Sequence, residues 1–269
     1  MEHMAAEKLL RLLRVWLRMS SMAAQAWLLN RWSGGLFILG KFARFLFFFI
    51  FLFTILSSAK NLAGYTREQV IFFFLVFNLI DIMAQCLFIG VYNFRPLVVS
   101  GNYDTDLLRP LPSFFRPVFG WIDIMDFLTL IPLWVYFLWF IFTNHLFGNL
   151  ESIALFLLLL INSLVLAFAF HLFVCAVCVL TTEIDHMISV YRDLTNMARF
   201  PTDIYQKGVQ FILTFTIPVV ILITIPAKAL LGLLSWQWIV FSFLITSLFL
   251  WASLRFWKYA LRQYSSASS

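Results

Sequence analysis

Six long apolar runs, separated by short polar segments, constrain this chain more than any other feature of its sequence. A helix needs about 20 apolar residues to cross a bilayer. The runs cover residues 36–58, 70–94, 118–142, 152–180, 209–225 and 236–257. Their number and length predict an all-α polytopic membrane protein with six transmembrane helices.

The composition points to the same class and excludes an ordinary soluble enzyme. Hydrophobic residues make up 62% of the chain and charged residues 12%, whereas soluble chains have about 45–50% and about 25%. The polar stretches are shorter than the roughly 50 residues that a separate soluble domain needs. We therefore expect no enzymatic domain in this chain. If its activity uses ATP, another protein hydrolyses it.

The positions of the 19 Lys and Arg residues predict the orientation of the chain. If the N-terminus lies inside, only Lys60, Arg67 and Lys228 fall on the outer side. Such an excess on one side is the positive-inside signal. It predicts an even number of spans with both termini cytoplasmic. The net charge of +6 therefore reflects orientation in a lipid bilayer, and we expect no nucleic-acid partner.

The segment 4–20 is amphipathic. Arg11, Arg14 and Arg18 recur at helical spacing on one face, while leucines and Trp16 occupy another. The segment carries too many charges to span a membrane, so we expect a helix along the membrane surface with Trp16 in the interface. Two interpretations stay open: a simple anchor, or an interface helix that also touches a cytoplasmic partner. Residues 1–35 would form this cytoplasmic helix and its linker.

Prolines interrupt the chain near the last two runs. Pro218 lies inside the fifth run and Pro226 follows it, and both predict helix breaks. Because the residues after Pro226 stay apolar, we expect a short re-entrant or interfacial helix within 224–238, with a plain turn as the alternative. Its backbone groups would need cover from protein or water. The transmembrane domain would then cover residues 36–259, and residues 260–269 would form a cytoplasmic tail.

Three polar side chains share one face of the second run. Asn78, Asp81 and Gln85 lie three and four residues apart. A charge at the middle of a span costs about 2.5–3.5 kcal/mol on insertion scales, so Asp81 must face protein or water, or be protonated. The three residues either line a pathway or hold two helices together by hydrogen bonds. The sequence leaves both interpretations open.

Two further carboxylates, Asp123 and Asp126, stand one helical turn apart at the start of the third run. Opposite charges within reach stabilise each other at the end of a span. We expect both carboxylates to pair with Arg109 or Arg116 rather than to carry chemistry.

No motif predicts a cofactor or a metal on this chain. Residues 35–42 match the first positions of a phosphate-binding loop, but Phe42 stands where a Ser or Thr must hold magnesium. Cys175 and Cys178 form a CxxC without the second pair that a zinc site requires. We therefore expect no metal site and no cofactor bound by this chain.

The loop 95–117, between the second and third runs, combines charged residues, leucines and prolines. We expect a short helix over 105–109 that stops before Pro110. Its leucines need a surface to pack on, as the apolar residues of a docking element for a soluble partner would. The candidate docking residues are Asp104, Leu107, Leu108, Arg109 and Pro110.

Within this loop the stretch Gly101-Asn-Tyr-Asp-Thr-Asp-Leu-Leu-Arg-Pro-Leu111 resembles a hallmark of bacterial ABC transporter permeases of the type 2 exporter class. That hallmark reads Gly-x-x-Asp-x-x-Leu-Leu-Arg-Pro-Leu after the second span. Residues 198–205 and the tail 260–269 are similar to segments of the same family. Together with the six runs and the amphipathic start, the resemblance covers essentially the whole chain.

The resemblance implies the membrane-spanning permease subunit of an ATP-driven exporter in the bacterial plasma membrane. Such permeases work with a second permease, related or identical, and with two copies of a separate ABC ATPase. ATP and Mg would be bound by the ATPase. The family's interface helix corresponds to residues 4–20 and its coupling element to residues 101–111. The cargo would be an amphipathic or hydrophobic compound moved by efflux.

Two other functions remain as alternatives at this stage. A proton-coupled secondary transporter would use Asp81 as its proton site and would need no docking loop. A non-transport membrane assembly protein would show no nucleotide-dependent flux.

Overall fold

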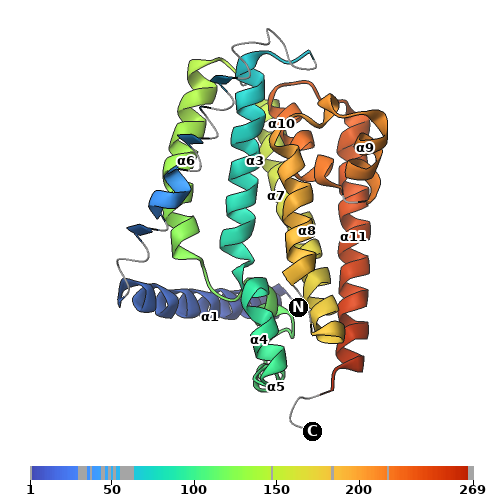
Figure 1. Ribbon diagram of the computed structural model, residues 1–269. Coiled ribbons are helices and arrows are strands. Elements are labelled where there is room, and N and C mark those ends of the chain that lie inside the picture. The colour runs from blue at the N-terminus through green and yellow to red at the C-terminus, as the bar shows by residue number, and fades with distance from the viewer. Residues whose placement is uncertain are drawn as a thin grey trace.

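The computed structural model describes residues 2–29, 35–36, 38–43, 46–47, 50, 53–54, 64–146, 148–182, 185–216 and 218–265. Its regular elements are helices, which confirms the predicted all-α class. The long helices stand side by side, and α1 (Glu2–Leu29) lies across their lower end (Figure 1).

Four of the described helices are long and apolar enough to cross a membrane. They are α3 (Arg67–Leu87), α6 (Ile124–Thr143), α7 (Leu150–Thr181) and α11 (Trp236–Gln263). A helix pair over residues 207–215 and 220–230, bent by 82°, would make a fifth if it were a single span. About half of the first expected run, 36–58, lies outside the described residues, so the described spans number four, or five with the bent pair.

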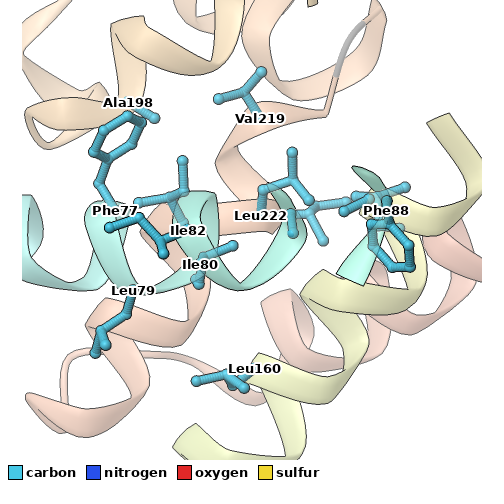
Figure 2. Close-up of a cluster of buried hydrophobic side chains, with 14 of the residues drawn as sticks. Phe77, Leu79, Ile80, Ile82, Phe88, Leu160, Ala198, Val219 and Leu222 are labelled. Carbon is cyan, nitrogen blue, oxygen red and sulfur yellow. The ribbon is translucent and has the colours of Figure 1, made fainter. Parts of the chain in front are cut away.

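Helix α3 forms the centre of the molecule. It begins at a capping box, in which Thr66 and Gln69 satisfy each other's backbone N–H groups. The apolar residues of α3 lie on nearly all of its faces, as is typical of a helix that neighbouring elements bury. Phe72, Phe73 and Phe77 are almost fully buried. Figure 2 shows Phe77 and its neighbours on α3 amid side chains from other elements, among them Leu160 of α7.

Helix α1 is longer than the predicted segment 4–20, because good helix formers such as Ala23, Ala24 and Gln25 continue it. Ser20 ties it to the bundle. The Ser20 hydroxyl accepts a hydrogen bond from the Ile122 backbone N–H at 2.9 Å and donates to the Trp16 carbonyl at 2.8 Å.

Short elements continue α3 at the lower end of the bundle. They are η1 (Ile89–Asn93), α4 (Phe94–Val99), α5 (Tyr103–Leu107) and η2 (Phe115–Phe119). The Arg95 side chain donates to the Thr182 carbonyl at the end of α7, at 2.9 Å. At the upper end the Gly148 N–H, between α6 and α7, donates to the Leu230 carbonyl at 3.4 Å. These contacts define the two ends of the molecule.

With both termini inside, the residues between the fourth and fifth expected runs, 181–208, would form a loop at the inner surface. In the structure this segment runs from the lower to the upper end instead. Helix α8 (Asp185–Asn196) starts three residues after Thr182, and its Tyr191 ring lies 5.1 Å from the His171 ring of α7. Beyond η3 (Met197–Arg199) and η4 (Thr202–Ile204), Asp203 reaches Tyr65 at the upper end. The prediction that residues 181–208 form a loop at the inner surface is therefore wrong. Many residues of this segment are polar, so its mean hydropathy does not identify it as a crossing.

The predicted fifth span, 209–225, belongs to a bent hairpin rather than a straight helix. Its first half is α9 (Lys207–Phe211) with η5 (Ile212–Thr216), and its second half is η6 (Val220–Thr224) with α10 (Ile225–Leu230). Near its end Lys228 Nζ lies 2.8 Å from Asp203 Oδ2, four residues before its start. Both ends of the hairpin therefore meet at the upper end, as in a re-entrant loop. We call residues 207–230 the re-entrant hairpin.

Prolines mark this hairpin as the sequence suggested. Pro218 stands between the two halves, and Pro226 occupies the first turn of α10. Proline fits the first turn of a helix because its missing N–H has no partner there. The expected short helix within 224–238 corresponds to α10, which leads through a turn at Gly232 (φ +69°) into α11.

Candidate functional site

The loop between α3 and α6 forms a compact structure below the bundle, which we call the platform (residues 94–119). A turn at Gly101, whose φ is +73°, folds α5 back after α4. Gly90 and Gly120 bring η1 and η2 into backbone contact, because a Cβ on Gly90 would lie 2.6 Å from the Arg116 carbonyl oxygen. Close backbone packing therefore joins the platform to the lower end of α3.

Aromatic contacts lock the platform onto α11. Tyr103 of α5 is fully buried, and its ring lies 5.0 Å from Phe94 and 5.6 Å from Tyr264. Its hydroxyl donates to the Ser113 carbonyl at 3.1 Å. Trp257 of α11 donates to the Ser113 hydroxyl at 3.0 Å. The platform and the end of α11 therefore form one packed unit.

Charged groups stiffen the same unit. Arg116 Nη1 donates to Asp106 Oδ1 at 2.6 Å, and Arg109 Nε lies 3.5 Å from the same oxygen. The Tyr264 hydroxyl donates to Asp104 Oδ1 at 2.8 Å. Burial and this hydrogen bond to a carboxylate raise the pKa of Tyr264 to about 12. Asp104 therefore holds the tail in place rather than pointing freely into solvent.

Two of the predicted docking residues stand out from this rigid base. Leu108 is 87% exposed and Leu107 is 39% exposed. Arg109 and Pro110 are exposed beside them. An exposed leucine on a stiff support resembles the apolar anchor of a protein–protein contact more than part of a core.

The carboxylates at the start of α6 do not pair as the sequence predicted. Asp123 caps α6 by accepting a hydrogen bond from the Met125 N–H at 2.8 Å. Asp126 is buried and forms an ion pair with Lys41. The expected pairing with Arg109 or Arg116 is wrong, because Asp106 lies closer to both arginines and takes that place.

The interface-helix residues divide between two faces of α1. Arg11, Arg14 and Arg18 are exposed. Trp16 is half-buried and lines a groove of about 430 Å³ between α1 and the platform, together with Leu12. The aromatic residue thus faces the bundle while the basic residues face away from it.

The three polar residues of α3 do not act together. Asn78 donates to the Phe74 carbonyl of its own helix at 2.7 Å. Asp81 accepts a hydrogen bond from Gln85 at 2.8 Å, and only these two line a cavity. This lower cavity has a volume of about 20 Å³, enough for one water molecule.

The other polar groups of the lower cavity come from two expected spans and from α8, which the sequence did not predict as a crossing. They are Tyr92 of η1, His171 of α7, and Tyr191, Arg192 and Thr195 of α8. The seven-residue spacing from Arg192 to Arg199, about two helical turns, was the available signal, since it places both basic residues on one face of a helix. Arg199 lies over the Phe77 ring of α3 at 5.4 Å.

A second cavity of about 210 Å³ lies at the upper end, inside the re-entrant hairpin. At its mouth Asp203 bridges two elements: Lys228 Nζ donates to Oδ1 at 3.0 Å, and the Tyr65 hydroxyl donates to Oδ2 at 2.6 Å. Gln210 and Thr214 of the hairpin also line this upper cavity. Within the described residues, no three His, Cys, Asp or Glu side chains gather as a metal site would require.

Comparison with known proteins agrees with the resemblance of the docking loop. A family model described as ABC-2 family transporter protein matches residues 42–268. The searches of curated proteins and of solved structures give no match. The match covers the described spans, the platform and the re-entrant hairpin. The chain is therefore a multi-pass membrane protein that belongs to the ABC-2 transporter family.

Proposed function

We propose that this chain is the permease subunit of an ATP-driven exporter in a bacterial plasma membrane, driven by a separate ATPase that docks on the platform. Membership of the ABC-2 family supports the kind of partner. The observation that carries the proposal is Leu108, 87% exposed on a loop that is otherwise locked in place. Two copies of the ATPase, holding ATP and Mg, and a second permease, related or identical, would complete the transporter.

The platform has the stiffness that force transmission needs. Movement of an ATPase bound at Leu108 would act first on α5, whose Tyr103 is packed against Trp257 of α11. It would reach α3 through the backbone contact between Gly90 and Gly120. Close-packed groups pass on displacement rather than absorbing it.

The distribution of basic residues supports a cytoplasmic lower end. The exposed arginines of α1, together with Arg95, Arg109 and Arg262, lie at this end. Because α8 crosses the bundle, Lys207 lies at the upper end, and Arg192 and Arg199 no longer count toward either end. Most Lys and Arg residues still lie at the lower end. By the positive-inside rule, this excess supports a cytoplasmic position for both termini.

Two contacts of the first apolar run support six spans. Lys41 pairs with Asp126 at the lower end of α6. The Arg67 guanidinium, at the upper end of α3, lies 3.9 Å from the centre of the Phe53 ring. A run that touches both ends has the reach of a span. With α3, α6, α7, the α8 crossing and α11, it makes six.

An amphipathic or hydrophobic cargo fits a bundle whose long helices carry apolar side chains outward. The proton-coupled alternative rests on Asp81, which is bonded to Gln85 beside a cavity of one water. It gives the exposed platform no role. The same holds for a membrane assembly protein without transport.

Copurification of the ATPase with Leu108→Asp tests the proposal. A charge forced into a desolvated contact can cost about 3–5 kcal/mol. At about 1.4 kcal/mol per decade this weakens association more than a hundredfold. We expect normal membrane levels, loss of the ATPase from the purified complex, and loss of its ATP hydrolysis.

Leu150→Asp is the matched control, since Leu150 is 82% exposed at the opposite end of the molecule. It should retain the ATPase, as should Leu108→Met. Full copurification with Leu108→Asp would rule out the platform as the docking site.

A further inference from the structure

The two polar cavities lie on opposite faces of one short element, the π-helical turn η6. Leu222 and Ile223 line the lower cavity, while Val220, Thr224 and Ile225 line the upper one. All five residues are at most 7% exposed. The two cavities are therefore separated by the thickness of a single helical turn.

Polar groups lie on both sides of this turn. The lower cavity contains Asp81 and Arg192, and the upper one contains Asp203 and Lys228. Charged residues within a membrane are costly and mark hydrophilic pathways. The segment between the cavities is apolar, and Figure 2 shows Leu222 within the apolar cluster that includes Ile80 and Ile82 of α3.

We propose that η6 is an apolar partition between two halves of a hydrophilic path inside a single chain, and that displacement of the re-entrant hairpin joins them. The joined path would admit water and small polar groups between α3, α8 and the hairpin. The proposal concerns this chain alone and does not depend on ATPase docking.

The hairpin has the features of a movable element. Its halves meet at 82° and both contain π-helical turns, which are frequent at functional sites. Polar contacts tie its upper end to neighbouring segments: the ion pair of Lys228 with Asp203, and a hydroxyl contact of 3.1 Å between Thr202 and Thr224. On the other side the Ser163 hydroxyl donates to the Ile221 carbonyl at 3.2 Å. The second half of the hairpin is also buried among apolar side chains of the core, so opening the partition must displace Leu222 and Ile223 as well as exchange these bonds.

Cysteine accessibility tests the partition directly. In a chain in which Cys86, Cys175 and Cys178 are replaced by alanine, Thr214→Cys reports on the upper cavity and Thr195→Cys on the lower one. The probe is a membrane-impermeant trimethylammonium-ethyl thiosulfonate, applied without nucleotide from the side that the upper end faces. We expect Thr214→Cys to react and Thr195→Cys to stay unreactive.

Opening the partition should change only the labelling of Thr195→Cys. Leu222→Ser should accelerate labelling of Thr195→Cys on the order of tenfold, equivalent to about 1.4 kcal/mol in the free energy of closure. Lys228→Met, which removes the ion pair at the mouth, should act in the same direction and serves if Leu222→Ser does not reach the membrane.

Leu230→Ser is the matched control, because Leu230 is as buried as Leu222 but lines neither cavity. It should leave Thr195→Cys unreactive. The proposal is overturned if Thr195→Cys is already reactive with the parent hairpin, if it stays unreactive in both opened variants, or if Leu230→Ser exposes it equally. Because no ATP is present, none of these results bears on docking at Leu108.

Discussion

At the scale of single residues, the platform depends on side chains that come together from distant parts of the sequence. Tyr264 in the tail and Asp104 in the loop are 160 residues apart, yet they share a hydrogen bond of 2.8 Å. Asp106 is buried and forms ion pairs with Arg116 and Arg109. These contacts let the exposed Leu108 stand on a firm base.

The Tyr264–Asp104 contact predicts a dependence on pH. Burial and the hydrogen bond raise the pKa of Tyr264 from 10.0 to about 12, so the contact stabilises the folded chain fully below pH 10 and is lost as the pH rises through about 12. Tyr264→Phe should cost about 0.5–1.5 kcal/mol at neutral pH. Thermal unfolding of both proteins from about pH 8 to about pH 12 should show the difference shrinking. A difference that stays constant to the highest pH would show that the hydroxyl contributes nothing through Asp104.

Residue identities in the loop could be predicted from the sequence, but their partners could not. Leu108 and Leu107 were expected to project because leucines in a charged, proline-rich loop need an outside surface. The partner of each charge depends on which helices lie next to each other. Asp126 therefore pairs with Lys41 instead of Arg109 or Arg116, a choice that only the packing of α6 determines.

At the scale of elements, the crossing after α7 is the main departure from the hydropathy pattern. Residues 185–203 are polar enough to resemble a loop, but α8 is a helix beside α7, with its Tyr191 ring 5.1 Å from the His171 ring and Thr195 buried. The apolar run that follows turns back on itself at the break beside Pro218. Long, uniformly apolar helices such as α3 and α7 could be predicted from the sequence, because a helix needs apolar side chains whether it faces lipid or the protein core. A short polar helix such as α8 carries no such signature.

This arrangement makes a prediction about sidedness. Lys207→Cys, at the start of α9, should be labelled by an impermeant thiol reagent from the same side of the membrane as Asn149→Cys, and from the side opposite to Leu108→Cys. The loop predicted from hydropathy places residue 207 with residue 108 instead. Labelling of Lys207→Cys from the Leu108 side would therefore restore the straight fifth span and refute the re-entrant hairpin.

At the scale of the whole molecule, the two regions to which we assign functions lie at opposite ends. The lower end carries the platform and α1, and the upper end carries the re-entrant hairpin and its cavity (Figure 1). Helix α3 spans the distance between them: it is joined to the platform through Gly90 and lies beside η6 at mid-height. A push from below therefore has a stiff route to the partition above.

Photo-cross-linking from position 108 tests most directly that a separate ATPase drives this chain through the platform. A benzophenone amino acid placed at Leu108 in native membranes should form a covalent adduct with a protein that binds ATP. The same group at Leu150 should form none with that protein. An adduct between position 108 and an ABC ATPase, lost in the presence of Asp106→Lys, is the result that the account predicts. If position 108 cross-links only to lipid while the assembled complex still hydrolyses ATP, the docking account is contradicted.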